Sequence, residues 1–114
     1  QPEQHDQAVS WISHLPVIVS ASLIAACLSE ADPEIAKLAQ NFASSGFRDT
    51  SRVGGGNPEL GVMMAQYNRQ ALLNSLYQYR ENLEEFIHII EGENWELLAE
   101  KIKLNHQALY NFLE

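Results

Sequence analysis

The chain has 114 residues and a formal net charge of -8, from 15 Asp and Glu against 7 Lys and Arg. Its length suits one domain with a modest core and leaves no room for a second core. The acidic balance argues against nucleic acid and anionic membranes as partners, because both bind surfaces of dense positive charge.

The first predicted element is an apolar helix from Asp6 to about Ser29, kinked at Pro16. Its residues are apolar on nearly every face, and such a helix has to be covered on all sides. The apolar run LPVIVSASLIAACL is 14 residues long, which is short for a membrane span, and the polar segment before it is unlike a signal peptide. We therefore expect a soluble protein. Cys27 has no cysteine partner, which favours a reducing compartment such as the cytoplasm.

A second helix is predicted from Asp32, as the capping residue, to about Gly46. Asp is a favoured capping residue, and Pro33 suits the first helical position because the N–H that it lacks would have no partner there. Positions three and four residues apart form the predicted inner stripe of this helix: Ile35, Leu38, Ala39 and Phe42.

A third, long helix is predicted from Asn57 and Pro58, which repeat the cap-and-proline start, to Gly92. Apolar residues recur through it at three- and four-residue steps. Such a helix would span roughly 50 Å, whereas a domain of this size has a radius of gyration of about 13 Å. Its far half is therefore expected to pack on another subunit.

The last predicted helix follows Gly92, in the segment NWELLAEKIKLNHQALYNFLE. No segment alternates as a strand does, and no repeat is found. The predicted fold class is therefore all-α, with about four main helices, the first kinked and the third long, in a single domain of residues 1–114. The side chains of the last helix that are expected to point inward are Trp95, Leu98, Ile102, Leu109 and Phe112.

Two residue patterns have the composition of chemical sites but lack the setting that those sites need. Asp6, Ser10 and His14 have the residue types of a hydrolase triad, yet a nucleophilic serine sits on a strained turn rather than inside a helix. Glu85 and His88 have the spacing of a di-metal ligand pair, but the sequence has no second Glu-x-x-His pair. We expect neither a hydrolase nor a metal site. His14 alone is either a satisfied core residue or a ligand contact.

The segment GFRDTSRVGGGNP, predicted as a loop, places Arg48 and Arg52 beside three glycines. An arginine fork can bind a carboxylate through two parallel hydrogen bonds, and the amides that start the next helix favour an anion. Alternatively, the arginines pair with Asp49 or a surface glutamate, and the glycines only supply a turn. The residues alone leave both interpretations open.

The chain contains HDQAVSWISHLP, then GFRDTSRVGGGNPEL, then NRQALLNSLYQYRENLEEFIHIIEG. In this order and with these separations, the segments resemble the C-terminal helical domain of the prephenate/arogenate dehydrogenase family, which includes bacterial and cyanobacterial arogenate dehydrogenases. The resemblance covers almost the whole chain. It implies an intertwined, all-α dimerisation domain, similar to the C-terminal domains of 6-phosphogluconate dehydrogenase-like enzymes, and therefore a homodimer.

The resemblance also implies an enzyme of tyrosine biosynthesis. Members of the family oxidatively decarboxylate prephenate or arogenate and pass a hydride to NAD or NADP. A Rossmann domain before the helical domain holds the cofactor and the catalytic histidine, and this sequence has neither its glycine motif nor a strand to carry it. The chain begins with Gln1 rather than Met, so we expect a piece of a longer polypeptide that is inactive by itself.

By the same resemblance, four residues are expected to form the substrate-binding site: Arg52, His14, Asp49 and Arg48. Arg52 would hold a substrate carboxylate, and Asp49 would orient an arginine or gate the cleft. His14 would contact the substrate, and Arg48 lies at a motif position with a more structural role. These roles would explain why an acidic chain places two arginines beside a triple glycine.

Two positions depart from the family pattern. Val17 stands where many relatives have a second histidine, and Gly61 stands where relatives often have an aromatic residue. The sequence does not distinguish prephenate from arogenate, or NAD from NADP. Two alternatives stay open: a non-catalytic helical homodimerisation module, and the helical domain of another NAD(P)-dependent dehydrogenase.

Overall fold

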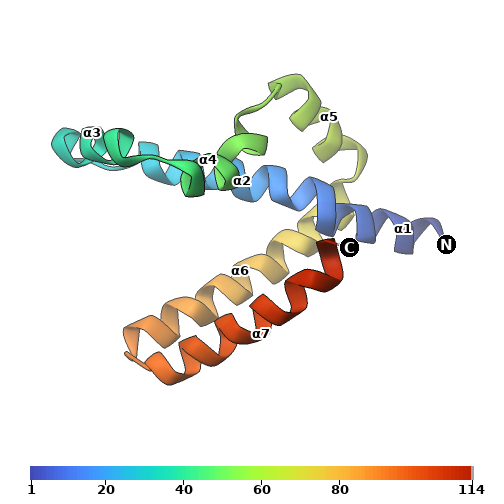
Figure 1. The fold of residues 1–114 in the computed structure, drawn as a ribbon. Coiled ribbons are helices and arrows are strands. Elements are labelled where there is room, and N and C mark those ends of the chain that lie inside the picture. The colour runs from blue at the N-terminus through green and yellow to red at the C-terminus, as the bar shows by residue number, and fades with distance from the viewer. Residues whose placement is uncertain (114) are drawn as a thin grey trace. The chain divides into compact units, whose positions relative to one another are not determined.

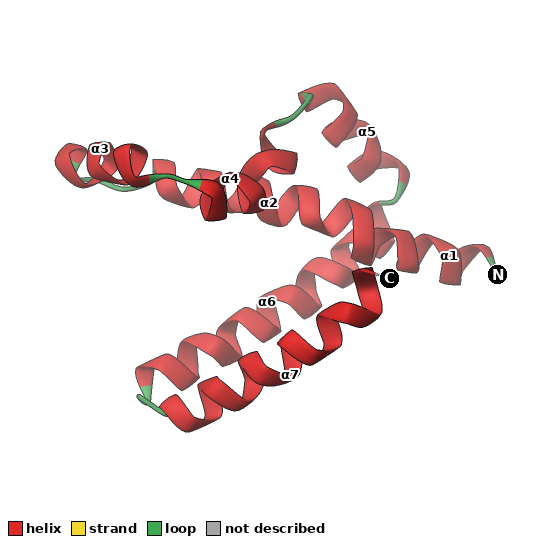
Figure 2. Ribbon diagram, in the orientation of Figure 1, coloured by secondary structure: helices red, strands yellow, loops and turns green. Residues whose placement is uncertain are grey.

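The computed structural model describes residues 1–113, which are helical except for short connections (Figure 1). No strand occurs among these residues (Figure 2), which confirms the all-α fold class. The chain divides into two compact units, residues 1–76 and the part from Tyr77 onwards. The elements are α1 (Pro2–Val9), a π-turn (Ser10–His14), α2 (Leu15–Leu28), α3 (Pro33–Phe42), α4 (Ser45–Ser51), a 3-10 turn (Arg52–Gly55), α5 (Pro58–Tyr67), α6 (Arg69–Glu91) and α7 (Trp95–Leu113).

The irregularity predicted at Pro16 takes the form of the π-turn that joins α1 to α2. The Leu15 N–H donates to the carbonyl of Ser10, five residues earlier, instead of four. Proline has no N–H, and its ring crowds the carbonyl four residues before it. A local change of helical type therefore accommodates Pro16 without ending the helix.

The helix from Pro2 to Leu28 is 27 residues long and, by length and composition alone, apolar enough to cross a membrane. The apolar run of 14 residues noted in the sequence is one part of this helix. The core helix of a soluble protein passes the same test. Only 11% of its most apolar window is buried, so the chain itself does not supply the predicted cover on all sides.

Buried hydroxyl groups hold α1 and the π-turn against the start of α6. Ser10 and Ser75 are both 0% exposed, and their Oγ atoms lie 2.8 Å apart. Ser10 Oγ also donates to the carbonyl of Ala71 at 3.2 Å, and Gln7 Nε2 donates to Ser75 Oγ at 2.8 Å. Small side chains let the two backbones approach closely, and each buried hydroxyl is hydrogen-bonded.

A second close approach fixes the 3-10 turn on α2. The Gly54 N–H donates to Oγ of Ser20 at 2.8 Å, and Ser20 is 1% exposed. A side-chain carbon at Gly54 would overlap the backbone of Ser20 and Ala21. The turn can therefore dock here only because residue 54 has no side chain.

Both predicted helix starts are confirmed. Oδ1 of Asp32 accepts the Glu34 N–H at 2.9 Å at the start of α3. Oδ1 of Asn57 accepts the Glu59 N–H, also at 2.9 Å, at the start of α5. In each case the proline follows the cap, as the sequence indicates.

The prediction of one continuous third helix is wrong, because the structure interrupts it at Asn68. This residue has φ -122° and ψ 40°, outside the helical region, and separates α5 from α6. The cause is tertiary: Nδ2 of Asn68 donates to the carbonyl of Asp6 at 2.9 Å. With 23 residues, α6 spans about 35 Å rather than the roughly 50 Å expected for one helix.

The prediction that the segment GFRDTSRVGGGNP is a loop is also wrong, because most of it is helical. It forms α4 and the 3-10 turn, and Oγ1 of Thr50 donates to the carbonyl of Gly46 at 2.8 Å within α4. The preceding helix, α3, ends at Phe42 rather than near Gly46. Arg48 and Arg52 therefore stand on helical backbone.

The second unit contains an antiparallel pair made by the later part of α6 and by α7 (Figure 1). Gly92 ends α6 as predicted, and Glu93 follows with φ 52°. Across the pair, Nζ of Lys101 donates to Oε1 of Glu85 at 2.8 Å and lies 5.5 Å from the ring centre of Phe86. Lys101 thus bonds a carboxylate while its ammonium lies over an aromatic face.

The stripes predicted to point inward are largely open within this chain. Trp95 and Ile102 of α7 are each 55% exposed, Phe112 is 74% exposed, and Phe42 of α3 is 76% exposed. The prediction that these side chains pack inward is therefore wrong for a single chain. Large exposed apolar surfaces of this kind mark sites of interaction.

The substitution Gly54→Ala should destabilise the first unit by about 1–3 kcal/mol, because its methyl group overlaps the backbone of α2. Chemical denaturation measures this change in the free energy of unfolding. Gly46→Ala is the matched control: nothing lies within 4 Å of its added carbon, so stability should be unchanged or slightly higher. Equal stability of both variants would contradict the close approach.

Candidate functional site

His14 is the last residue of the π-turn and is half-buried. Its Nδ1 atom lies 3.2 Å from Nδ2 of Asn68, at the junction between α5 and α6. The same Nδ2 atom donates to the carbonyl of Asp6 at 2.9 Å. The Asn68 amide thus joins the junction between α5 and α6 to two points of the N-terminal helix, Asp6 in α1 and His14 at the end of the π-turn.

These contacts determine which nitrogen of His14 carries the proton. A backbone carbonyl only accepts, so the NH2 group of Asn68, not its oxygen, must face Asp6. The second N–H of that group then points to Nδ1 of His14, which must accept. The proton of the neutral ring therefore sits on Nε2. Within residues 1–113 this Nε2–H has no hydrogen-bond partner, so it can donate to a ligand.

Arg48 and Asp49 lie in α4, and Arg52 is the first residue of the 3-10 turn; all three are exposed. Among the described residues, none of the three forms an ion pair. Pairing of the arginines with Asp49 or a surface glutamate is thus not seen. Two positive charges stand free on helical backbone, in the form that can bind a carboxylate.

The structure brings the turn that carries Arg52 and the residue His14 to the same helix. The turn docks through Gly54 on Ser20, and Ser20 follows His14 by about 9 Å of helix rise. No hydrogen bond joins Arg52 to His14 in the described part of the chain. The two side chains are therefore not engaged with each other, and each is left to make other polar contacts.

The remaining candidate residues have other partners. Ser10 Oγ bonds to Ser75 and to the carbonyl of Ala71, so its contacts are those of a packed interior. Glu85 bonds to Lys101. Nδ1 of His88 lies 3.5 Å from Oε1 of Glu91, and both side chains are well exposed.

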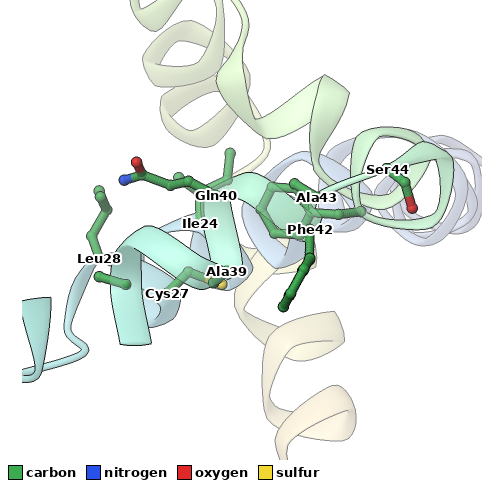
Figure 3. Close-up of a pocket in the computed structure, with 10 residues that line it drawn as sticks. Ile24, Cys27, Leu28, Ala39, Gln40, Phe42, Ala43 and Ser44 are labelled. Atoms are coloured by element: carbon green, nitrogen blue, oxygen red, sulfur yellow. The ribbon is translucent and has the colours of Figure 1, made fainter. Parts of the chain in front are cut away.

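A cavity of about 530 Å³ lies elsewhere in the first unit, between α2, α3 and the start of α4 (Figure 3). Ile24 and Cys27 line it from α2, Ala39 and Phe42 from α3, and Phe47 from α4. The lining is mostly apolar, with Gln40 and Ser44 as its polar members, and includes none of the candidate site residues. Its chemistry suits an apolar surface rather than a charged small molecule.

The sequence model for the dimerization domain of prephenate dehydrogenase matches residues 1–104. The chain belongs to this family. The assignment made from three sequence segments is thereby confirmed.

Relatives of the prephenate dehydrogenase dimerization domain agree with this assignment. The chain is 29% identical to prephenate dehydrogenase of Bacillus subtilis, over 90% of this chain and 27% of that protein. It is 26% identical to cyclohexadienyl dehydrogenase of Zymomonas mobilis, over 93% of this chain and 36% of that protein. It therefore spans about a third of the length of the curated relatives that it matches.

Two solved structures have the same fold. The crystal structure of Synechocystis arogenate dehydrogenase superposes with a TM-score of 0.97 at 57% identity, over 98% of this chain and 40% of that one. Prephenate dehydrogenase from A. aeolicus, solved with hydroxyphenyl propionate and NAD+, superposes with a TM-score of 0.79 at 24% identity, over 90% of this chain and 35% of that one.

Sequence reasoning missed Asn68, which lay inside the third predicted helix. One signal could have found it: asparagine is a weak helix former and hydrogen-bonds readily through its side chain. It also missed the role of Ser20, because the sequence does not show which backbone N–H donates to the hydroxyl oxygen of a serine in an apolar helix.

In the variant Ser20→Ala, the Gly54 amide loses its acceptor, which should cost about 1–3 kcal/mol of stability. Amide hydrogen exchange at Gly54 should become faster, while exchange in α7 should not change. Ser22→Ala is the control, because Ser22 lies on the same helix and is exposed. Unchanged exchange at Gly54 would show that the turn is held by other contacts.

Proposed function

We propose that this chain is the dimerisation and substrate-binding part of an NAD(P)-dependent dehydrogenase of tyrosine biosynthesis, with arogenate or prephenate as substrate. The observation that carries the proposal is the similarity to Synechocystis arogenate dehydrogenase, at 57% identity and a TM-score of 0.97. This similarity makes arogenate the first substrate to test. The family membership supports the same class of enzyme.

The proposed reaction is an oxidative decarboxylation. A hydride passes from the ring carbinol carbon to NAD+ or NADP+, the hydroxyl proton goes to a base, and the lost carboxylate leaves as carbon dioxide. The electron pair of the broken C–C bond aromatises the ring, and the phenolate oxygen that results takes up a proton. Residues 1–113 form no strand, so a dinucleotide fold and the catalytic histidine would come from another part of the polypeptide. This domain alone would be inactive.

Arg52 is proposed to bind a substrate carboxylate, because its guanidinium is exposed and makes no ion pair with the described residues. Asp49, in the preceding helical turn, would orient an arginine or gate the site. Arg48 would add positive potential next to them. His14 would donate from Nε2 to an oxygen of the substrate. This set supplies binding and orientation rather than chemistry.

The exposed apolar faces support a homodimer. A soluble monomer rarely exposes large contiguous apolar patches, and α7 exposes Ile102, Leu109 and Phe112. A second copy of the chain would cover these faces and the surface of α2. We place the assembled enzyme in the cytoplasm, because the one cysteine of this chain, Cys27, is free.

Arg52→Ala in the full-length enzyme should lower kcat/KM for arogenate or prephenate, because the substrate carboxylate loses its charged partner. The decrease should correspond to a loss of about 2–4 kcal/mol of transition-state stabilisation. The KM for the cofactor should hardly change. Steady-state kinetics with both substrates and both cofactors measures these effects.

Arg80→Ala is the control for Arg52→Ala, because Arg80 lies over Tyr77 at 5.3 Å and is not among the proposed site residues. Its kinetics should match those of the wild type. If Arg52→Ala also behaves as the wild type, the arginine segment is structural, and a non-catalytic role in dimerisation becomes the better account of this part of the chain.

Ile102→Glu should raise the dissociation constant of the homodimer by about 100-fold or more, because it places a charge in an apolar contact. Analytical ultracentrifugation of the full-length enzyme measures this change. Lys103→Glu changes charge at the neighbouring exposed position and should leave the dimer intact. Equal dissociation constants for Ile102→Glu and the wild type would exclude this face of α7 from the interface.

A further inference from the structure

Two interruptions of regular helix meet at a single hydrogen bond. The π-turn ends at His14, and the junction between α5 and α6 is Asn68. Asn68 is 9% exposed, and its side chain bonds to Nδ1 of His14 and to the carbonyl of Asp6. Departures from local sequence preference that converge in this way are typical of sites selected for function rather than for stability.

We propose that Asn68 is a positioning residue that keeps His14 as an Nε2–H donor toward an oxygen of the substrate. The proposal rests on the function proposed above, in which His14 contacts the substrate. Asn68 itself acts only through the histidine ring. Its bond to the Asp6 carbonyl fixes the direction of the amide, and the amide then fixes the tautomer of the ring.

Asparagine is the residue that this arrangement requires. The two N–H bonds of its side chain reach two acceptors at once. An aspartate in its place would present only acceptors, which repel the Asp6 carbonyl and favour a proton on Nδ1 of His14. A leucine would fit the apolar spacing of a continuous helix but would leave Nδ1 without a donor. Holding an imidazole in one tautomer through its other nitrogen is an established way to set its role.

The first test needs no substitution. In the full-length enzyme labelled with 15N-histidine, long-range proton–nitrogen correlation spectra identify the protonated ring nitrogen, and the variant His14→Ala assigns the His14 signals. The proposal expects the proton of the neutral ring on Nε2. A neutral ring with its proton on Nδ1 would overturn the proposal.

The second test uses kinetics of the full-length enzyme. Asn68→Asp should raise the KM for the substrate by about 10- to 100-fold, because the ring then presents an acceptor where a donor is needed. The KM for the cofactor should not change, and the His14 signals should move to the other tautomer. Asn74→Asp makes the same chemical change on α6 at a residue that bonds to Gln7 and not to His14, so it should behave as the wild type.

A double variant separates positioning from an independent role. If Asn68 acts only through the ring, Asn68→Asp should have no further effect on the substrate KM when His14→Ala is present. Additive effects would overturn the proposal. Thermal unfolding of each variant verifies folding, and the spectra of the wild type remain decisive if Asn68→Asp does not fold.

The outcomes also distinguish this proposal from the proposed function. If His14→Ala raises the substrate KM and Asn68→Asp does not, the positioning role is wrong, while the substrate contact of His14 stands. If neither variant changes the substrate KM, the contact of His14 is itself wrong, and the role of Asn68 falls with it. The substitution at Arg52 tests the carboxylate site separately from both.

Discussion

The contact between the 3-10 turn and α2 is the constraint on which the candidate site depends. Gly54 has no side chain, so its backbone reaches Ser20 and donates to a buried hydroxyl. The same solution recurs at Ser10 and Ser75, where α1 approaches α6. The first unit is thus held by small residues and satisfied hydroxyls at its closest contacts. Several of its large apolar side chains, among them Leu28 and Phe42, stay exposed in the single chain, as at sites of interaction.

The polar residues of the candidate site use two different kinds of support. Arg52 takes its place from a backbone contact two residues away, and Arg52 itself is exposed. His14 takes its orientation from a side-chain contact, the amide of Asn68. A residue that binds charge can tolerate a mobile side chain, because attraction does not need one geometry. A residue that donates one hydrogen bond needs a defined tautomer and direction.

Local sequence signals predicted the fold where local interactions decide it. The caps at Asp32 and Asn57 and the end of α6 at Gly92 are examples, and the all-α class follows from them. The break at Asn68 was missed, because apolar spacing continues across it and the carbonyl that its side chain bonds is distant in sequence. The weak helix preference of asparagine was the one local signal. Periodicity also located the apolar faces without showing what covers them. For the site, motif resemblance named His14 and Arg52, but neither the support from Asn68 nor that from Gly54 is visible in a motif.

The docking of the 3-10 turn on α2 separates positions that tolerate substitution from one position that does not. Residue 54 leaves no space for a side chain, whereas residues 48, 49 and 52 of the same segment are exposed. New side chains at these three positions would alter the charge presented to a ligand and leave the backbone in place. A segment built in this way lets ligand preference diverge by single substitutions at little cost in stability. Because Gly54 fixes the backbone of this segment, substitutions at the exposed positions can change ligand preference while the fold is kept.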